Sequence, residues 1–323
     1  MKQIIFFVIL IIFASVVGLG QSLSVSAEEG LIPSWIKTTA GFWINDQVSD
    51  SEFISALQFM VENNIIQIPE KSLTPEDKGD FYVTYNLNPN SIHDYSAMNL
   101  IADSKYFESN IEYLNGLFAL PHDVEIQLIE CNVANAFYDW NLKQIIICYE
   151  FIDSVYSNFE LTHQSEIASG SMTTEDIIIM TKDVMDFAFY HELGHALIDV
   201  YDLPITGLEE NAADQFSTIF LLVTENQEGY EGVVGQDILY NVGTWFLVQT
   251  ELYEQSAYWD VHNLDAQRFY NISCYAYGQH PEYNQDLIDD GYLPVERAGN
   301  CEYEYGLMAK SWNTLLSKYY KVN

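Results

Sequence analysis

The spacing of apolar residues changes along this chain from a two-residue period to a helical one. Segments 124–128 and 144–147 are apolar or alternate with polar residues, and the residues between them surround Trp140. This pattern predicts strands around a turn, in a region that begins at 81–85. A helix is predicted before these strands, over 100–117.

Helical spacing dominates the chain after Asp176. The predicted helices include 237–254 and 306–320, besides a helix through His191 that is discussed below. A region of strands followed by a region of helices indicates an α+β fold. The sequence therefore predicts one α+β domain over residues 81–323.

Two short amphipathic helices are predicted within residues 31–70. Pro33 suits a first helical position, and Ser49 to Glu52 have the pattern of a capping box before an apolar stripe. The segment resembles a small helical module of secreted archaeal proteins. At ~40 residues it is marginal as an independent domain, so we expect it to pack on something, either as an adaptor for a cell-envelope partner or as an accessory cap. A linker is expected at 71–80.

The first 27 residues have the pattern of a secretory signal peptide. Lys2 precedes an uncharged run over 4–19, and small residues lead to a cleavage site after Ala27. The run is shorter than the ~20 residues that span a bilayer comfortably, although an uncleaved N-terminal anchor is the alternative. We therefore expect a signal peptide over 1–27 and a secreted or extracytoplasmic mature chain.

The four cysteines agree with a location in an oxidising compartment, where disulfides form. Cys131 and Cys148 flank the predicted turn, and Cys274 and Cys301 bracket a C-terminal loop region. Four cysteines allow three pairings, and the sequence does not choose among them, although sequential pairing closes the shortest loops. A thiolate metal site is not expected, since no cysteine lies near His191.

The composition is strongly acidic. The chain has 47 Asp and Glu against 12 Lys and Arg, a formal net charge of −35. Such a surface repels phosphates, so no nucleic-acid partner is expected, and it suits a salty medium in which charges are screened over ~8 Å or less. Because 49% of the residues are hydrophobic and 15% aromatic, a disordered acidic protein is excluded.

The strongest chemical signal is His191-Glu192-Leu193-Gly194-His195. On a helix, His191 and His195 lie on one face, so both imidazoles can bind one Zn²⁺. Glu192 lies beside them and can take a proton from water as a general base. Gly194 is a poor helix former, and its presence indicates close approach of another backbone.

A third ligand is available on the helix predicted to follow. Glu210 comes after His195 and a short loop, which lets its helix return onto the first. Asp214, one turn after Glu210, shares its face and can accept the second ring N–H of a ligand histidine. Glu209 is the competing ligand, but it would share a stripe with apolar residues and is predicted to lie in the core.

His-Glu-Leu-Gly-His followed by Glu-x-x-Ala-Asp-x-Phe resembles the gluzincin branch of zinc metallopeptidases. In that branch a glutamate on the following helix is the third ligand and an acidic residue one turn later supports a histidine; Glu210 and Asp214 occupy these positions. From about residue 80 to 320 the chain is also similar to a family of secreted metallopeptidases. That likeness includes segments 262–271 and 293–301. The resemblance implies a zincin-like domain, one catalytic zinc ion, a peptide or protein substrate and a substrate-binding edge strand, expected between 124 and 148.

The expected reaction is metal-assisted hydrolysis of a peptide bond. Glu192 accepts a proton from the attacking water, and a further donor must stabilise the oxyanion. His262 and the two arginines, Arg268 and Arg297, are the candidates in the C-terminal region. His262 is the preferred catalytic candidate, because an arginine among so many acidic residues is more often a structural ion-pair partner, as Arg268 would be with a carboxylate such as Asp265.

Two other functions remain open at the level of sequence. A secreted binding or structural protein could hold zinc for stability without turnover, although a purely structural site would not need Glu192. A zinc hydrolase that acts on a non-peptide amide would use the same residues.

Overall fold

The computed structural model describes residues 34–45, 47–62, 76–86, 106–224, 234–252 and 262–321. By internal contacts the chain divides into two units, Met1–Lys71 and Ser72–Asn323. The predicted signal peptide, Pro33 and the start of the helix predicted over 100–117 lie outside the described residues. Within the described ranges, no helix is both long enough and apolar enough to cross a bilayer.

The described part of the first unit consists of α2 (Ser34–Ile44) and α3 (Asp50–Glu62). The predicted capping box is present: the backbone N–H of Ser49 donates to the Glu52 carboxylate, and the Glu52 N–H donates to the Ser49 hydroxyl. The rings of Trp43 and Phe53 stack with their centroids 4.9 Å apart. The two predicted helices therefore contact each other through aromatic side chains.

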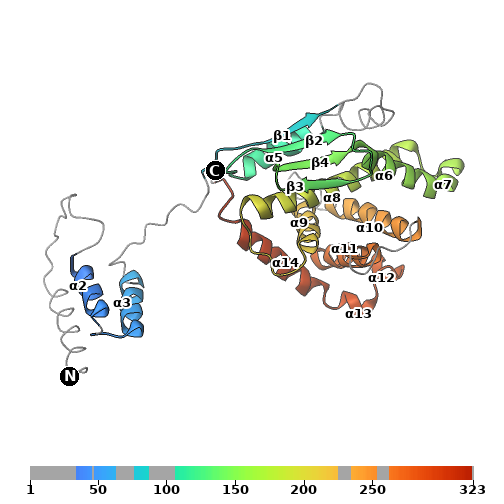
Figure 1. Cartoon of the computed structure of the whole chain (residues 1–323). Helices are drawn as coiled ribbons and strands as arrows, with labels where there is room; N and C mark the ends of the chain where they lie inside the picture. Colours follow the sequence, from blue (N-terminus) through green and yellow to red (C-terminus); the bar gives the residue numbers. More distant parts are fainter. Residues whose placement is uncertain are drawn as a thin grey trace. The chain divides into compact units, whose positions relative to one another are not determined.

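A four-stranded sheet begins the second unit (Figure 1). Its strands are β1 (Phe81–Tyr85), β2 (Val124–Ile129), β3 (Ala136–Asp139) and β4 (Gln144–Cys148). Their spatial order is β1-β2-β4-β3; β1, β2 and β4 are parallel, and β3 is an antiparallel edge strand. Burial alternates along β2, with Val124, Ile126 and Leu128 buried, as expected for a sheet with one face on the core.

Helices form the other layer of this unit. They are α5 (Tyr106–Leu117), α6 (Tyr149–Thr162), α7 (Gln164–Ser169), α8 (Thr174–Val200), α9 (Glu209–Thr224), α10 (Val234–Leu252), α11 (Asp265–Gln279), α12 (Asp286–Asp289), α13 (Val295–Ala298) and α14 (Cys301–Leu316). In Figure 1 the sheet is the upper layer, and α8 to α11 and α14 lie beneath it. This mixture of helices and a small sheet confirms the predicted α+β fold.

Helix α8 lies at the centre of the core. It begins at a capping box formed by Thr173 and Asp176. It contacts β3 and β4 on one side and α6, α9 and α10 on the others. Because neighbours surround it, its buried residues are not confined to one stripe.

Several predicted elements differ in detail from the structure. The hairpin around Trp140 consists of β3 and β4, whereas β2 pairs with β4 in parallel. The helix predicted over 306–320 begins at Cys301. Hydrophobic spacing missed this first turn because a buried half-cystine, rather than an apolar stripe, holds it.

The two disulfides follow the sequential pairing, Cys131–Cys148 and Cys274–Cys301, and no cysteine is free. The first joins the loop after β2 to the end of β4, and the second joins α11 to the start of α14. Gly278 permits the second crossing: a Cβ there would lie 2.2 Å from the Cys301 carbonyl oxygen. Any side chain at 278 would therefore force these helices apart.

Candidate metal centre

Helix α8 carries His191, Glu192 and His195 in its C-terminal half. All three residues are buried, with exposed fractions of 5%, 7% and 8%. Since His191 and His195 are about one turn apart, their imidazoles lie on the same face. Their Nε2 atoms are 3.3 Å apart, close enough to bind a common cation.

Gly194 allows α9 to lie close to α8. A Cβ at this position would lie 3.1 Å from the Ala213 Cα atom, which is tighter than ordinary contact. The close backbone approach predicted for Gly194 is therefore confirmed. It brings the first turn of α9, with Glu209 and Glu210, to the two imidazoles.

Glu210 completes a set of three converging atoms, the ligand triangle: His191 Nε2, His195 Nε2 and Glu210 Oε2. The carboxylate oxygen lies 3.1 Å from His191 Nε2 and 3.4 Å from His195 Nε2. Ligands ~2.0–2.1 Å from a tetrahedral zinc ion lie roughly 3.3 Å from one another. The observed separations, 3.1, 3.3 and 3.4 Å, agree with that value. The residues present therefore fit a small divalent cation.

A carboxylate also contacts the other nitrogen of each imidazole. Asp214 Oδ1 lies 2.8 Å from His191 Nδ1, and Glu209 Oε1 lies 2.7 Å from His195 Nδ1. An Nδ1–H that donates to a carboxylate leaves the Nε2 lone pair for a metal. Each contact therefore favours the tautomer that the ligand triangle requires.

The prediction that Glu209 belongs to the apolar core is wrong. Its side chain is 34% exposed, and its carboxylate binds His195. The helical stripe suggested burial, but Glu209 is the first residue of α9. There the side chain can extend along the seam with α8 instead of entering the core.

The buried charges shift one another's pKa values in the metal-free protein. Burial favours neutral His191, but Asp214 and Glu210 outweigh it and raise the His191 pKa to about 9. Burial alone would raise the pKa of Glu210, yet hydrogen bonds with His191 and its neighbours hold that pKa far below its ordinary value. Burial raises the pKa of Glu192. One carboxylate thus stays ionised, while the other is suited to accept a proton.

His262 is a third imidazole at this site. Its side chain is 48% exposed, and its Nε2 lies 2.9 Å from Glu210 Oε2. His191, Glu210 and His262 also form a group whose ligand atoms all lie within 4.8 Å of one another. His195 is buried whereas His262 is half exposed, so the two imidazoles reach Glu210 from different environments. The half-exposed His262 is better placed to contact a substrate.

Arg268 lies behind Asp214. Its Nε donates to Asp214 Oδ2 at 2.9 Å, and its Nη2 donates to Oδ1 at 2.6 Å. The predicted pairing of Arg268 with a carboxylate is confirmed, but the carboxylate that accepts its hydrogen bonds is Asp214 of α9 rather than Asp265. Arg297 pairs with Glu304 at 2.8 and 2.6 Å. Both guanidinium groups are thus bound to carboxylates.

A contact that the sequence analysis missed holds edge strand β3 to α8. The Tyr138 hydroxyl donates to Asp199 Oδ2 at 2.7 Å, and the Lys143 ammonium lies 2.5 Å from the same oxygen. Asp199 is about one turn beyond His195 on α8. No local pattern indicates this contact, because its residues come together only when the hairpin packs on the helix. It fixes an edge strand beside the ligand triangle.

The α+β fold and the converging histidines and carboxylates are those of a metallopeptidase-type domain. Residues 86–316 match a family described as "Putative metallopeptidase", and the chain belongs to this family. Membership implies a peptidase that uses a metal ion and acts on a peptide or protein. No curated protein and no solved structure matches the chain.

Proposed function

We propose that this protein is a secreted zinc-dependent peptidase of the gluzincin type. The observation that carries the proposal is the ligand triangle, whose three separations of 3.1 to 3.4 Å suit one tetrahedral ion. His191, His195 and Glu210 would hold the zinc ion, and a fourth position would remain for water. Two imidazoles and one carboxylate form the ligand set of several zinc peptidases.

In this mechanism the protein moves one proton. A zinc ion bound by the triangle would polarise the scissile carbonyl and lower the pKa of water toward ~7. Glu192 takes the proton from the attacking water and passes it to the leaving amine, a task suited to a carboxylate whose pKa is raised by burial. His262 donates a hydrogen bond to the oxygen that becomes negative in the transition state.

Edge strand β3 is the element that we assign to substrate binding. It ends the sheet next to α8, and its outer edge offers main-chain groups to an extended peptide. Tyr138 and Lys143 fix it to Asp199, so the strand keeps its position relative to the ligand triangle. A peptide paired with β3 would thus be presented in a defined register.

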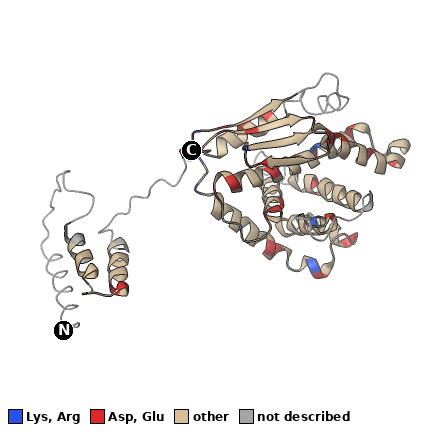
Figure 2. Cartoon of the chain, viewed as in Figure 1, with Lys and Arg blue, Asp and Glu red and all other residues tan. Residues whose placement is uncertain are grey.

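The proposed site of action is outside the cytoplasm. The pattern over 1–27 and the two disulfides support this location. Figure 2 shows acidic positions, in red, spread over the helices of the second unit, with few basic positions, in blue, among them. The module at 31–70, which resembles one of secreted archaeal proteins, would bind an envelope partner or act as an accessory cap.

A zinc-stabilised binding protein is the alternative function. Glu192 argues against it, because this buried carboxylate lies beside the triangle and completes no ligand set. A zinc hydrolase of a non-peptide amide would share the site, although family membership favours a peptidase.

The test combines metal analysis with turnover. The mature chain is expected to contain one zinc ion and to digest a broad peptide library, with a Glu192→Gln variant as control. This variant should keep its zinc and its fold, because the substitution removes no ligand. Its rate should fall ~10²–10⁴-fold, because the substitution removes the general base. A Glu192→Gln protein that cleaves at the wild-type rate, or a wild type that cleaves nothing with zinc bound, would contradict the proposed function.

A further inference from the structure

Arg268 contacts the metal centre, yet the proposed reaction gives it no role. Its two hydrogen bonds, 2.9 and 2.6 Å long, engage both oxygens of Asp214. One of these oxygens, Oδ1, also lies 2.8 Å from His191 Nδ1. A continuous set of contacts therefore leads from Arg268 through Asp214 to the ligand triangle.

We propose that Arg268 is a positioning residue of the metal centre, which acts through Asp214 to fix the orientation of His191. The inference rests on the proposed zinc site. A bidentate guanidinium fixes the plane of a carboxylate as well as its position. With this plane fixed, Asp214 Oδ1 faces His191 Nδ1, retains the proton there and directs Nε2 toward the other two ligand atoms.

Arg268 is itself held on several sides. Its side chain is only 14% exposed, and the guanidinium carbon lies 4.3 Å from the centre of the Phe246 ring on α10. Just before α11, the Asn263 amide donates to Asn211 of α9 at 2.6 Å. The start of α11 is thus attached to α9 at two points. This buried arrangement differs from a surface ion pair, whose long side chains change rotamer freely.

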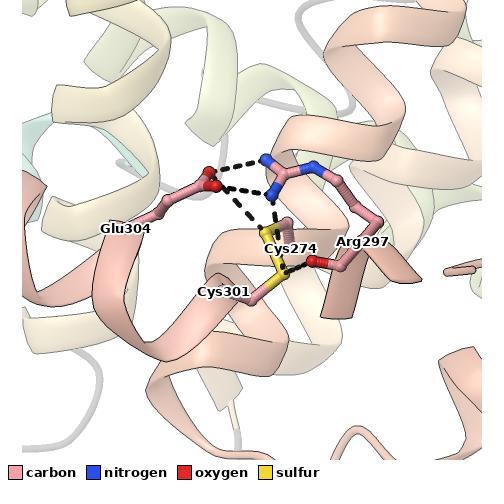
Figure 3. Close-up of a disulfide and its surroundings, with 4 residues drawn as sticks. All are labelled: Cys274, Arg297, Cys301 and Glu304. Carbon is pink, nitrogen blue, oxygen red and sulfur yellow. Dashed lines mark hydrogen bonds and ion pairs between the residues drawn. A yellow bond between two sulfur atoms is a disulfide. The ribbon is translucent and has the colours of Figure 1, made fainter. Parts of the chain in front are cut away.

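A purely structural ion pair is the competing interpretation, and the chain provides an example of one. Arg297 binds both oxygens of Glu304, at 2.8 and 2.6 Å, beside the Cys274–Cys301 disulfide (Figure 3). The further contacts of this pair in Figure 3 are with sulfur atoms, not with an imidazole. Since these are the two arginines of the sequence, Arg297 is a matched control.

The experiment compares equivalent changes at the two arginines in the mature full chain. Arg268→Lys keeps the charge but loses the bidentate fork, and Arg268→Gln loses both. The zinc dissociation constant is measured by competition with a chromophoric chelator, and the visible spectrum of the Co²⁺-loaded protein reports the ligand geometry. We expect zinc affinity to fall about 10-fold in Arg268→Lys and up to about 100-fold in Arg268→Gln, with an altered Co²⁺ spectrum.

The controls separate positioning from stability. Arg297→Lys and Arg297→Gln should lower the thermal midpoint but leave zinc affinity and the Co²⁺ spectrum unchanged. Asp214→Asn should weaken zinc binding, and adding Arg268→Gln to it should weaken binding little further, because both changes act on one contact. Arg268→Lys, which retains the charge and most of the volume, keeps the test valid if Arg268→Gln does not fold.

The inference and the proposed function fail differently. Wild-type zinc affinity in folded Arg268→Lys and Arg268→Gln would overturn the inference alone and leave Arg268 a structural residue. Fully additive losses in the Asp214→Asn/Arg268→Gln protein would show that Arg268 does not act through Asp214. A wild-type chain that binds no divalent metal would overturn the proposed function and this inference together.

Discussion

Helix α11 contributes residues to two regions, which differ in the groups that surround an arginine–carboxylate pair. One is the candidate metal centre. The other is the disulfide cluster, which consists of Cys274, Leu287, Leu293, Ala298 and Cys301. Each region has one arginine in a bidentate pair with a carboxylate. At the candidate metal centre the carboxylate of the pair also contacts the His191 imidazole, whereas beside the disulfide cluster the further contacts of the pair are with sulfur atoms.

This difference separates the region to which we assign the reaction from a structural one. In the ligand triangle, lone-pair atoms of His191, His195 and Glu210 face one another at 3.1 to 3.4 Å. Such an arrangement is unfavourable unless protons or a cation lie between the atoms. The charges of Arg297 and Glu304 already neutralise each other. An arginine pair of this geometry therefore suggests function only when its carboxylate is shared with a further polar group.

Among the changes that test this comparison, removal of a proposed ligand should have the largest effect on zinc affinity. His191→Ala, His195→Ala and Glu210→Ala should each weaken zinc binding by more than ~100-fold, because even supporting residues typically cost 10–100-fold. Glu209→Ala should weaken it only about 10-fold, since it removes an orienting contact. Chelator competition on the folded variants measures both. Equal losses at 209 and 210 would contradict the assigned triangle and make Glu209 a ligand.

The features that the sequence predicted depend on short-range spacing. The helical period alone predicts that His191 and His195 lie on one face of a helix. The same period predicts that Glu210 and Asp214, one turn apart, share a face of the next helix. Their roles as zinc ligands and support stay predictions. The sequential disulfides were favoured by loop length and are present.

The features that the sequence missed depend on how helices and strands cross. Arg268 could be expected to bind a carboxylate, but its partner is set by the packing of α11 on α9. The role of Glu209 arises from the close approach at Gly194. The strand order β1-β2-β4-β3 follows from pairings across the connections, which local patterns do not encode.

Loss of the proposed oxyanion donor should have the next largest effect. His262→Ala should lower kcat about 10²–10³-fold, with zinc affinity and the thermal midpoint nearly unchanged. The control is His280→Ala at the exposed end of α11, which should leave kcat unchanged. Steady-state kinetics at full zinc occupancy measures the change. An unchanged kcat would exclude His262 from the mechanism, and a loss of zinc would instead make it a ligand.

Loss of a disulfide should have the smallest effect on the metal centre. The Cys274→Ser/Cys301→Ser protein opens a loop of sequence separation 27 and should lose roughly 2–4 kcal/mol of unfolding free energy. Its zinc affinity and kcat at 25 °C should match the wild type, because no ligand contact involves the disulfide cluster. Denaturant unfolding, chelator competition and thiol titration check these points.

The control is Cys131→Ser/Cys148→Ser, which loosens β4 and, through it, the proposed substrate strand β3. This variant should therefore raise KM as well as lower stability. Weaker zinc binding in the Cys274→Ser/Cys301→Ser protein would show that α11 couples the two regions, and the separation of reactive and structural roles would not hold.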